Sequence, residues 1–292
     1  MLKVRVRVLI AALAVTALLG AACSNGSSSA GPGAAPTTSA SAAFTTIKSG
    51  FITVGSCLDY APFETVKGKN PIGFDVELTD AIAAKLGYDK NHVSWVKASF
   101  NTIFTSVAQG NFDVVAAAVT ATGKTGAQRA QVVSFSDYYY NSLQSLAVNS
   151  ANSPNITSPD QLVKGDSVGV QKGTTGFQWA VDNLQSKGVQ IRTYTSATDA
   201  FRDLSAGNLT GVINDEPSSY AIAATMTDVK VVAPIDTNEK YAFALSPTNT
   251  ALVTAWNDGL KQVVADGEYA TIFQKYFPGT PVPAEYSAAP AS

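Results

Sequence analysis

The chain has 292 residues, 46% of them hydrophobic and only 14% charged, with one His and two Cys. These scarcities exclude a His-based metal cluster, a Cys-rich zinc site and a disulfide scaffold, and a formal net charge of −2 argues against nucleic-acid binding. The length allows one large domain or two lobes, and the shortage of titratable groups favours a binding protein over a catalyst.

The first 22 residues are predicted to be a signal peptide. Three basic residues precede an uncharged stretch, 8–22, which is shorter than the about 20 apolar residues that span a bilayer. It runs into Leu18-Leu-Gly-Ala-Ala-Cys23, which resembles a bacterial lipobox. Cys23 is therefore expected to carry a lipid that anchors the exported protein to the outer face of the bacterial cell membrane, whether extracellular or periplasmic. The alternative is an ordinary secretory signal cut near Ala22.

A segment that cannot form a core follows the signal peptide. Residues 24–43 contain no charge and no large apolar side chain, so they bury too little surface to offset the entropy of ordering. Residues 23–46 are therefore predicted to be a flexible tether, and the Pro/Ala/Ser-rich stretch 280–292 is predicted to be a disordered tail. With Cys23 lipidated, Cys57 would be unpaired.

Strand-like apolar runs alternate with helical patterns in the folded part. In the first half we expect a strand over 51–55, a helix over 73–86, a strand over 93–96, a helix over 102–109 and a strand over 114–118. In the second half we expect a strand over 167–170, a helix from 175, a strand over 191–194, a helix over 198–206, a strand over 211–214 and a helix from 217, with a further short helix starting at Pro159. This alternation predicts an α/β fold with mostly parallel sheets in two lobes.

The loops at the carboxyl ends of the strands are the candidate ligand site, because ligands of open α/β sheets bind there. Tyr60 follows the first strand and Phe100 opens a later helix, so each ring is a candidate wall. In loop 119–129, Gly123-Lys124-Thr125 matches only the end of a phosphate-binding P-loop, because Ala118 stands where its first Gly belongs. No nucleotide or other cofactor is therefore expected.

Three further features suit the two ends of a free amino acid. The hydroxyl-rich turn that leads to Arg129 fits a carboxylate, because a guanidinium pairs with two oxygens at once. Loop 170–176 is a Gly-containing strand-to-helix turn, whose backbone N–H groups also bind anions. Asp215 follows a strand and precedes a helix, where it either caps the helix or pairs with an ammonium group. These loops together predict a ligand with one anionic and one cationic end.

Short motifs are spread through the folded part. They are Ile52-Thr-Val-Gly55, Tyr60-Ala-Pro-Phe-Glu64, Gly73-Phe-Asp-Val-Glu-Leu78, Gly110-Asn-Phe-Asp113, Arg129-Ala-Gln-Val-Val-Ser-Phe-Ser-Asp-Tyr-Tyr139, Val168-Gly-Val-Gln-Lys-Gly-Thr-Thr175, Ala206-Gly207, Val212-Ile-Asn-Asp215, Gly267-Glu-Tyr269 and Ile272-Phe-Gln-Lys-Tyr-Phe277. Their order and spacing resemble the amino-acid-binding proteins of ABC importers, in the cluster that contains the glutamine-binding protein. The resemblance covers about residues 48–279, nearly all of the folded part.

The resemblance implies a two-lobed periplasmic-binding-protein fold, also called a Venus flytrap. Lobe one would comprise residues 47–137 and 242–279, and lobe two would comprise residues 143–236. Two crossing segments, near 138–142 and 237–241, would act as the hinge between the lobes.

The resemblance also implies contacts to the two ends of the ligand. Arg129 and the hydroxyl of Thr120 would hold the carboxylate, together with the backbone N–H of Thr175. Asp215 and the carbonyl of Ala118 would hold the ammonium group.

The remaining implied contacts are to the ligand side chain. Tyr60 and Phe100 would sandwich it, and Cys57, Gln171 and Asn214 would contact its tip. Glutamine binders carry an Asp where this chain has Cys57, and no Arg or Lys occupies a tip position. A neutral or polar amino acid is therefore expected, with glutamine itself in doubt.

One departure from the family pattern concerns the cation for the carboxylate. The spacing between Thr122 and Arg129 is about four residues longer than the usual Thr-x-x-Arg. Four residues are close to one helical turn, so Arg129 can still face the cleft, but Lys124 is an alternative cation.

The predicted function is capture of a free amino acid by a monomer that closes around it and delivers it to an ABC permease in the membrane. No catalytic residues are assigned. Three alternatives stay open: a secreted enzyme of the same fold, similar to cyclohexadienyl dehydratase, the sensing module of a receptor, and a binder of another small cationic or opine-type ligand.

Overall fold

The computed structural model describes residues 44–287. The predicted signal peptide, the predicted lipidation site Cys23 and most of the predicted tether lie outside the described residues, as does the tail from residue 288. Within the described part, no helix is long and apolar enough to cross a membrane.

One eight-stranded sheet runs through both lobes, in the order β4-β1-β5-β10-β6-β9-β7-β8. Neighbouring strands run parallel in lobe one, and they do so again in lobe two, as the alternation of strands and helices predicts. The strands of lobe one are β1 (Ile52–Ser56), β4 (Val93–Lys97) and β5 (Val114–Val115), with a separate hairpin of β2 (Thr65–Lys67) and β3 (Asn70–Ile72). The strands of lobe two are β7 (Ser167–Gln171), β8 (Gln190–Tyr194) and β9 (Gly211–Asp215).

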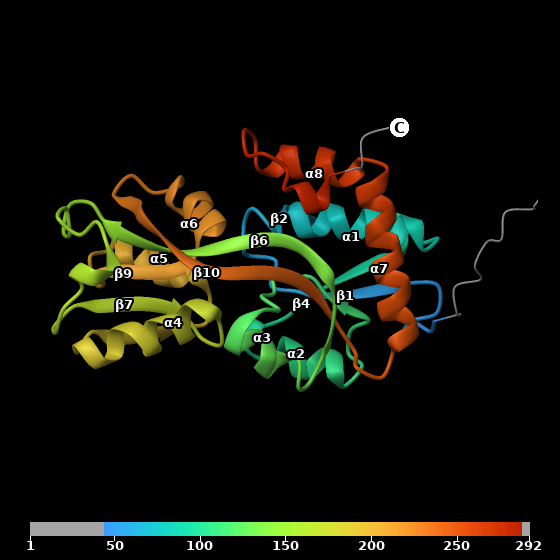
Figure 1. Cartoon of the computed structure of the whole chain (residues 1–292), viewed down its shortest axis with the longest axis horizontal. Helices are drawn as coiled ribbons and strands as arrows, with labels where there is room; N and C mark the ends of the chain where they lie inside the picture. Colours follow the sequence, from blue (N-terminus) through green and yellow to red (C-terminus); the bar gives the residue numbers. More distant parts are fainter. Residues whose placement is uncertain (1–43, 288–292) are drawn as a thin grey trace, which may run out of the picture. The chain divides into compact units, whose positions relative to one another are not determined.

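Two long strands join the lobes. β6 (Ser134–Asn149) leaves lobe one, β10 (Val229–Leu245) returns to it, and the two pair antiparallel along their length (Figure 1). The prediction of mostly parallel sheets is therefore wrong at the centre of the sheet. Strands that cross between the lobes in opposite directions pair antiparallel with each other, and also with β5 and β9.

Helices lie on both faces of the sheet (Figure 1). Lobe one carries α1 (Phe74–Lys85), α2 (Phe100–Ala108), α3 (Gly123–Arg129), α7 (Thr250–Ala265) and α8 (Glu268–Tyr276). Lobe two carries α4 (Thr175–Leu184), α5 (Ala197–Ser205) and α6 (Glu216–Ala223). Short 3-10 turns complete the chain at η1 (Lys90–His92), η2 (Pro159–Gln161), η3 (Gln185–Lys187) and η4 (Ala284–Tyr286), so the helix predicted to start at Pro159 is a single turn.

The core of lobe one is rich in aromatic side chains. Phe74, Tyr139 and Trp256 are fully buried where α1, α7 and α8 pack against the sheet. The periodic residues of α1 face this core, as their helical spacing predicts. With both faces covered, the strand ends and their loops are the parts of each lobe that can present polar groups to a ligand.

The predicted tether reaches residue 46, but its last residues contact lobe one. The ring centroid of Phe44 lies 6.2 Å from that of Tyr88, and Asn249 Nδ2 donates to the carbonyl oxygen of Thr45 at 2.9 Å. The prediction is therefore wrong for residues 44–46, because Phe44 supplies an aromatic ring that packs on lobe one.

The other end of the described chain also packs on lobe one. Tyr286, in η4, is 5% exposed, and its ring centroid lies 5.3 Å from that of Tyr269. The predicted disorder of 280–292 is therefore wrong for residues 280–287. Burial of the Tyr286 ring is enough to order this segment, although the residues around it are small or polar.

Replacing Tyr286 with Ala is expected to destabilise the fold by about 2 kcal/mol, because the contacts of a buried ring are lost. In a protein of this size that corresponds to a decrease in Tm of about 4–8 °C in a thermal melt. Tyr220→Ala is the matched control, since Tyr220 is 54% exposed and its loss should leave Tm nearly unchanged. Equal melting of the Tyr286 variant and the parent would show that the tail contributes nothing to stability.

Candidate functional site

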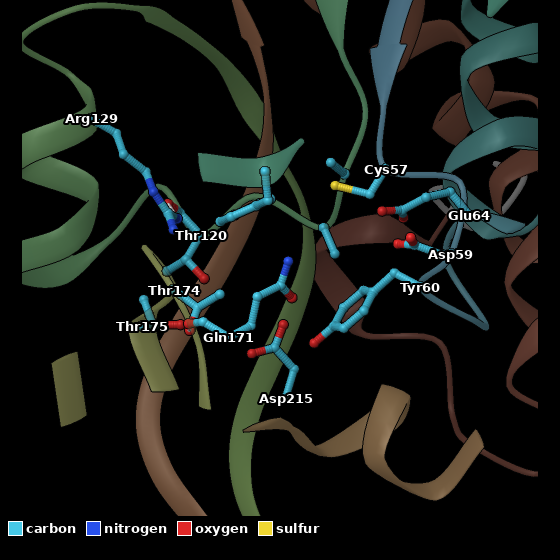
Figure 2. A pocket seen from close by; sticks show the side chains of 13 residues that line it. Cys57, Asp59, Tyr60, Glu64, Thr120, Arg129, Gln171, Thr174, Thr175 and Asp215 are labelled. Carbon is cyan, nitrogen blue, oxygen red and sulfur yellow. Dashed lines mark hydrogen bonds between the residues drawn. The ribbon is translucent and has the colours of Figure 1, made fainter. Parts of the chain in front are cut away.

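A cavity of about 370 Å³ lies between the lobes, at the loops that follow the strands (Figure 2). Nine of the ten predicted ligand residues line it: Cys57, Tyr60, Phe100, Ala118, Thr120, Arg129, Gln171, Thr175 and Asp215. Four further residues line it that the sequence analysis did not assign, namely Asp59, Glu64, Ala117 and Thr174. Residues far apart in the chain thus meet in one enclosed space.

Arg129 supplies a buried positive charge at one end of the cavity. It is the last residue of α3, is 6% exposed, and donates to the carbonyl oxygens of Thr120 at 2.7 Å and of Gly173, in lobe two, at 3.1 Å. Its guanidinium carbon lies 4.9 Å from the ring centroid of Phe104. Burial lowers the pKa of Arg129 to about 10, against the opposing effect of Asp215 and other acidic groups, so it is charged at neutral pH.

The longer loop before Arg129 is helical. The residues from Gly123 to Arg129 form α3, and this extra turn brings Arg129 to the cavity. Lys124, the alternative cation, has a side chain that is 61% exposed, pairs with Asp182 of lobe two at 3.4 Å, and does not line the cavity. The geometry therefore favours Arg129 over Lys124.

Asp215 supplies a buried negative charge in the same cavity. It ends β9, is 8% exposed and makes no capping bond to α6, so the helix-cap alternative does not apply. The hydroxyl of Tyr241 donates to it at 2.6 Å, and Gln144 Nε2 donates to its other oxygen. Burial and the nearby Glu239 raise the pKa of Asp215 to about 6. Its carboxylate points into the cavity (Figure 2).

Ala118 lies at a sharp turn after β5. Its φ is +47°, a left-handed conformation that shortens the predicted strand, and its N–H donates to Asp75 Oδ2 at 2.8 Å. Tyr139 Oη donates to the same oxygen at 2.8 Å, and burial raises the pKa of Asp75 to about 6. A buried carboxylate therefore fixes the turn that presents Ala118 to the cavity.

Two residues of the crossing strands hold the threonines of the site. Glu239 of β10, 3% exposed, accepts hydrogen bonds from the hydroxyls of Thr120 at 2.5 Å and Thr175 at 2.9 Å. Gln144 of β6, fully buried, donates to Glu239 at 3.0 Å and to Thr175 at 3.1 Å. Neither residue was predicted to belong to the site, because the crossing segments were expected to be connections only.

Acidic side chains gather at the opposite end of the cavity, around Cys57. Glu64 is fully buried and neither carboxylate oxygen has a hydrogen-bond partner within the described part. Burial, with Asp75 and Asp59 nearby, raises the pKa of Glu64 well above its usual range. Asp59 pairs with Lys97 at 3.3 Å. Figure 2 shows Glu64 and Asp59 beside the thiol of Cys57.

Comparison with known proteins gives the family. The pattern of the bacterial extracellular solute-binding proteins, family 3, matches residues 52–279. The chain belongs to this family. As a family 3 solute-binding protein it has the two-lobed periplasmic-binding-protein fold, which confirms the fold predicted from the sequence.

Similar proteins include both binders and a precursor of an enzyme. The lysine/arginine/ornithine-binding periplasmic protein of Escherichia coli (strain K12) is 28% identical over 242 residues, which cover 77% of this chain and 87% of that protein. An ancestral arginine-binding protein bound to arginine is 30% identical with a TM-score of 0.72, over 78% of this chain and 98% of the other. The ancestral amino acid-binding protein AncCDT-1, a precursor of cyclohexadienyl dehydratase, is 31% identical with a TM-score of 0.70, over 78% and 96% respectively.

Asn214 is the one predicted ligand residue of this solute-binding protein that does not line the cavity. Its Oδ1 accepts from the hydroxyl of Tyr60, in lobe one, at 3.0 Å, and its Nδ2 donates to Ser219 Oγ at 3.3 Å. The amide is therefore occupied by contacts within the protein, including one between the lobes, and it is not available to a ligand tip.

Proposed function

We propose that this solute-binding protein captures a free α-amino acid in the interlobe cavity and delivers it to an ABC permease, while a lipid on Cys23 holds it at the membrane. The observation that carries the proposal is the pair of buried opposite charges, Arg129 and Asp215, in one cavity. A guanidinium suits the carboxylate of an amino acid and a carboxylate suits its ammonium group. Amino-acid binding by similar proteins supports the same conclusion.

Closure of the lobes fits this role. Arg129, Thr120 and Tyr60 come from lobe one, whereas Thr175 and Asp215 come from lobe two. A ligand that bonds to both sets has a higher affinity for the closed state, and this difference in affinity drives closure.

We further propose that the ligand has a cationic side chain, rather than the neutral or polar one expected from the sequence. Arg129 and Asp215 balance the two ends of the amino acid, which leaves Glu64 as a buried carboxyl with no hydrogen-bond partner among residues 44–287. A buried carboxylate is costly unless it is paired, so a positive group is the ligand tip that offsets the cost best.

The test is a thermal-shift and calorimetry panel of the common amino acids and ornithine on the purified protein. A true ligand stabilises the folded protein in proportion to ln(1 + [L]/Kd), so it stands out from the rest. We expect arginine, lysine or ornithine to give the largest shift. A panel in which no amino acid raises Tm would contradict the proposed function.

Replacing Glu64 with Gln is expected to weaken binding of the cationic ligand by about 10- to 100-fold, because a hydrogen bond to a charged group is lost. Binding of glutamine should change little, because an amide tip is satisfied by either residue. Glu285→Gln, at a half-exposed position outside the cavity, is the control. Equal loss of cationic and neutral ligands in the Glu64 variant would mean that this residue supports the fold and does not select the ligand.

A secreted dehydratase is the second candidate. Burial raises the pKa of Glu64 and so favours the protonated form that a general acid needs, and AncCDT-1 is a similar structure. Incubation with a cyclic amino-acid precursor separates the two functions, because a binding protein returns it unchanged and a dehydratase releases product.

A further inference from the structure

Glu239 is turned into the protein at an irregular point of β10. The pairing of β10 with β6 shifts register between Ile235 and Glu239, and Asn238 has a φ of +49°. This irregularity displaces residues 236–238 and leaves the Glu239 side chain 3% exposed between the crossing strands. A charged residue is thus placed at the centre of the hinge.

The two oxygens of Glu239 contact different parts of the molecule. Oε1 accepts from Thr237 Oγ1 at 2.7 Å and from Gln144 Nε2 at 3.0 Å, which links the two crossing strands. Oε2 accepts from Thr120 Oγ1 at 2.5 Å and from Thr175 Oγ1 at 2.9 Å, which links lobe one to lobe two. One carboxylate therefore joins both hinge strands and both lobes.

These bonds also determine which contacts Thr120 and Thr175 can make with a ligand. A hydroxyl has one hydrogen to donate, and both Thr120 and Thr175 give theirs to Glu239. Their remaining lone pairs can only accept. The carboxylate of a ligand is then left to Arg129 and to backbone N–H groups, such as that of Thr175 in the first turn of α4.

We propose that Glu239 is a positioning residue that makes closure of the lobes and formation of the carboxylate end of the site a single event. It does not line the cavity, so it acts through Thr120 and Thr175. The bond to Thr175 requires lobe two to be in place, and the bond to Thr120 requires lobe one. This inference rests on the proposed function only in taking the interlobe cavity as the ligand site.

The first test needs no ligand. Fluorescent labels at K67C and K187C, on exposed positions of lobe one and lobe two, report the distance between the lobes by energy transfer. We expect the ligand-free parent to populate the closed state and Glu239→Gln to lower that population several-fold, because an amide cannot accept from every donor around it. An unchanged population in the variant would overturn the proposal, whether or not any amino acid binds.

The second test uses L-arginine as the probe. Glu239→Gln should weaken its binding about tenfold or more, with the change in the dissociation rate and not in the association rate. Thr175→Val should weaken arginine binding similarly. The double variant Glu239→Gln/Thr175→Val should bind arginine no more weakly than the weaker of the two single variants, because both substitutions remove the same bond. Fully additive losses would overturn the proposal.

Two controls separate positioning from folding. Glu268→Gln removes a carboxylate of α8 that is 44% exposed and pairs with Lys85 at 3.2 Å, and it should change neither the lobe distance nor arginine binding. Should Glu239→Gln fail to fold, Thr175→Val alone still removes the contact with lobe two, and its lobe distance decides the question. Failure of the panel of amino acids would count against the proposed function, whereas the ligand-free lobe distance counts for or against Glu239.

Discussion

Arg129→Ala is expected to weaken binding of the amino-acid ligand by about 30- to 5,000-fold. Removing one partner of a buried, hydrogen-bonded charge pair costs about 2–5 kcal/mol, mostly because the other charge is left buried and unpaired. The Arg129 guanidinium is 6% exposed and lines the cavity, so water cannot replace it fully. Isothermal titration calorimetry measures the loss directly.

Lys124→Ala is the matched control for this prediction. Lys124 lies on the same short helix, but its side chain is 61% exposed and pairs with Asp182. A surface pair of this kind contributes at most about 1 kcal/mol, so the variant should bind within about fivefold of the parent. If Lys124→Ala lost the ligand and Arg129→Ala kept it, the two residues would have to exchange roles.

Asp215→Asn is expected to weaken binding by about 10- to 150-fold. The amide keeps the shape of the side chain but removes the charge that pairs with the ammonium group, and a hydrogen bond between charged groups contributes about 1.5–3 kcal/mol. Tyr241 and Gln144 donate to different oxygens of Asp215, so the single Asn oxygen keeps one of these two bonds and the fold should be retained. A variant that binds as well as the parent would remove Asp215 from the ammonium site.

The pH dependence of binding follows from the same carboxylate. The ammonium group pairs with ionised Asp215, whose pKa in the ligand-free protein is about 6. For an amino acid with a neutral side chain, which does not need ionised Glu64, affinity should therefore be complete above about pH 7 and should decrease as the pH falls through 6, approaching tenfold per pH unit below it. Calorimetry at pH 5 and pH 8 should show this difference in the parent, and a smaller one in Asp215→Asn. An equal pH dependence in both would assign the titration to another group.

Much of the candidate site could be predicted because it lies in loops at strand ends. Tyr60 lies in the loop after β1, Arg129 lies in the segment after β5 and Asp215 ends β9, and parallel strands bring their carboxyl ends to one edge of the sheet. The same loop that contains Tyr60 also contains Asp59 and Glu64. Their contribution could not be recognised, because the position of a carboxyl in a cavity depends on contacts between distant segments, which no local pattern reports.

The hinge could not be predicted to the same depth. The crossing segments were expected to be short, but β6 and β10 extend over 16 and 17 residues. Glu239 meets Thr120 across a separation of 119 residues, and no local periodicity reports such a contact. The prediction of disorder for residues 280–287 was wrong for a related reason. The burial of Tyr286 depends on its contact with Tyr269 and not on the polar residues next to it in the sequence.

The turn at Ala118 has a consequence for the order of events in ligand capture. Asp75 and Ala118 belong to lobe one and Tyr139 to the lobe-one end of β6, so the bonds that hold this turn need nothing from lobe two. Under the proposed function, an arriving amino acid meets a finished half-site, and Asp215 joins it only on closure. Lobe one would then set the association rate of the ligand. Lobe two would set its dissociation rate, and so the time for which it stays bound before transfer to the permease.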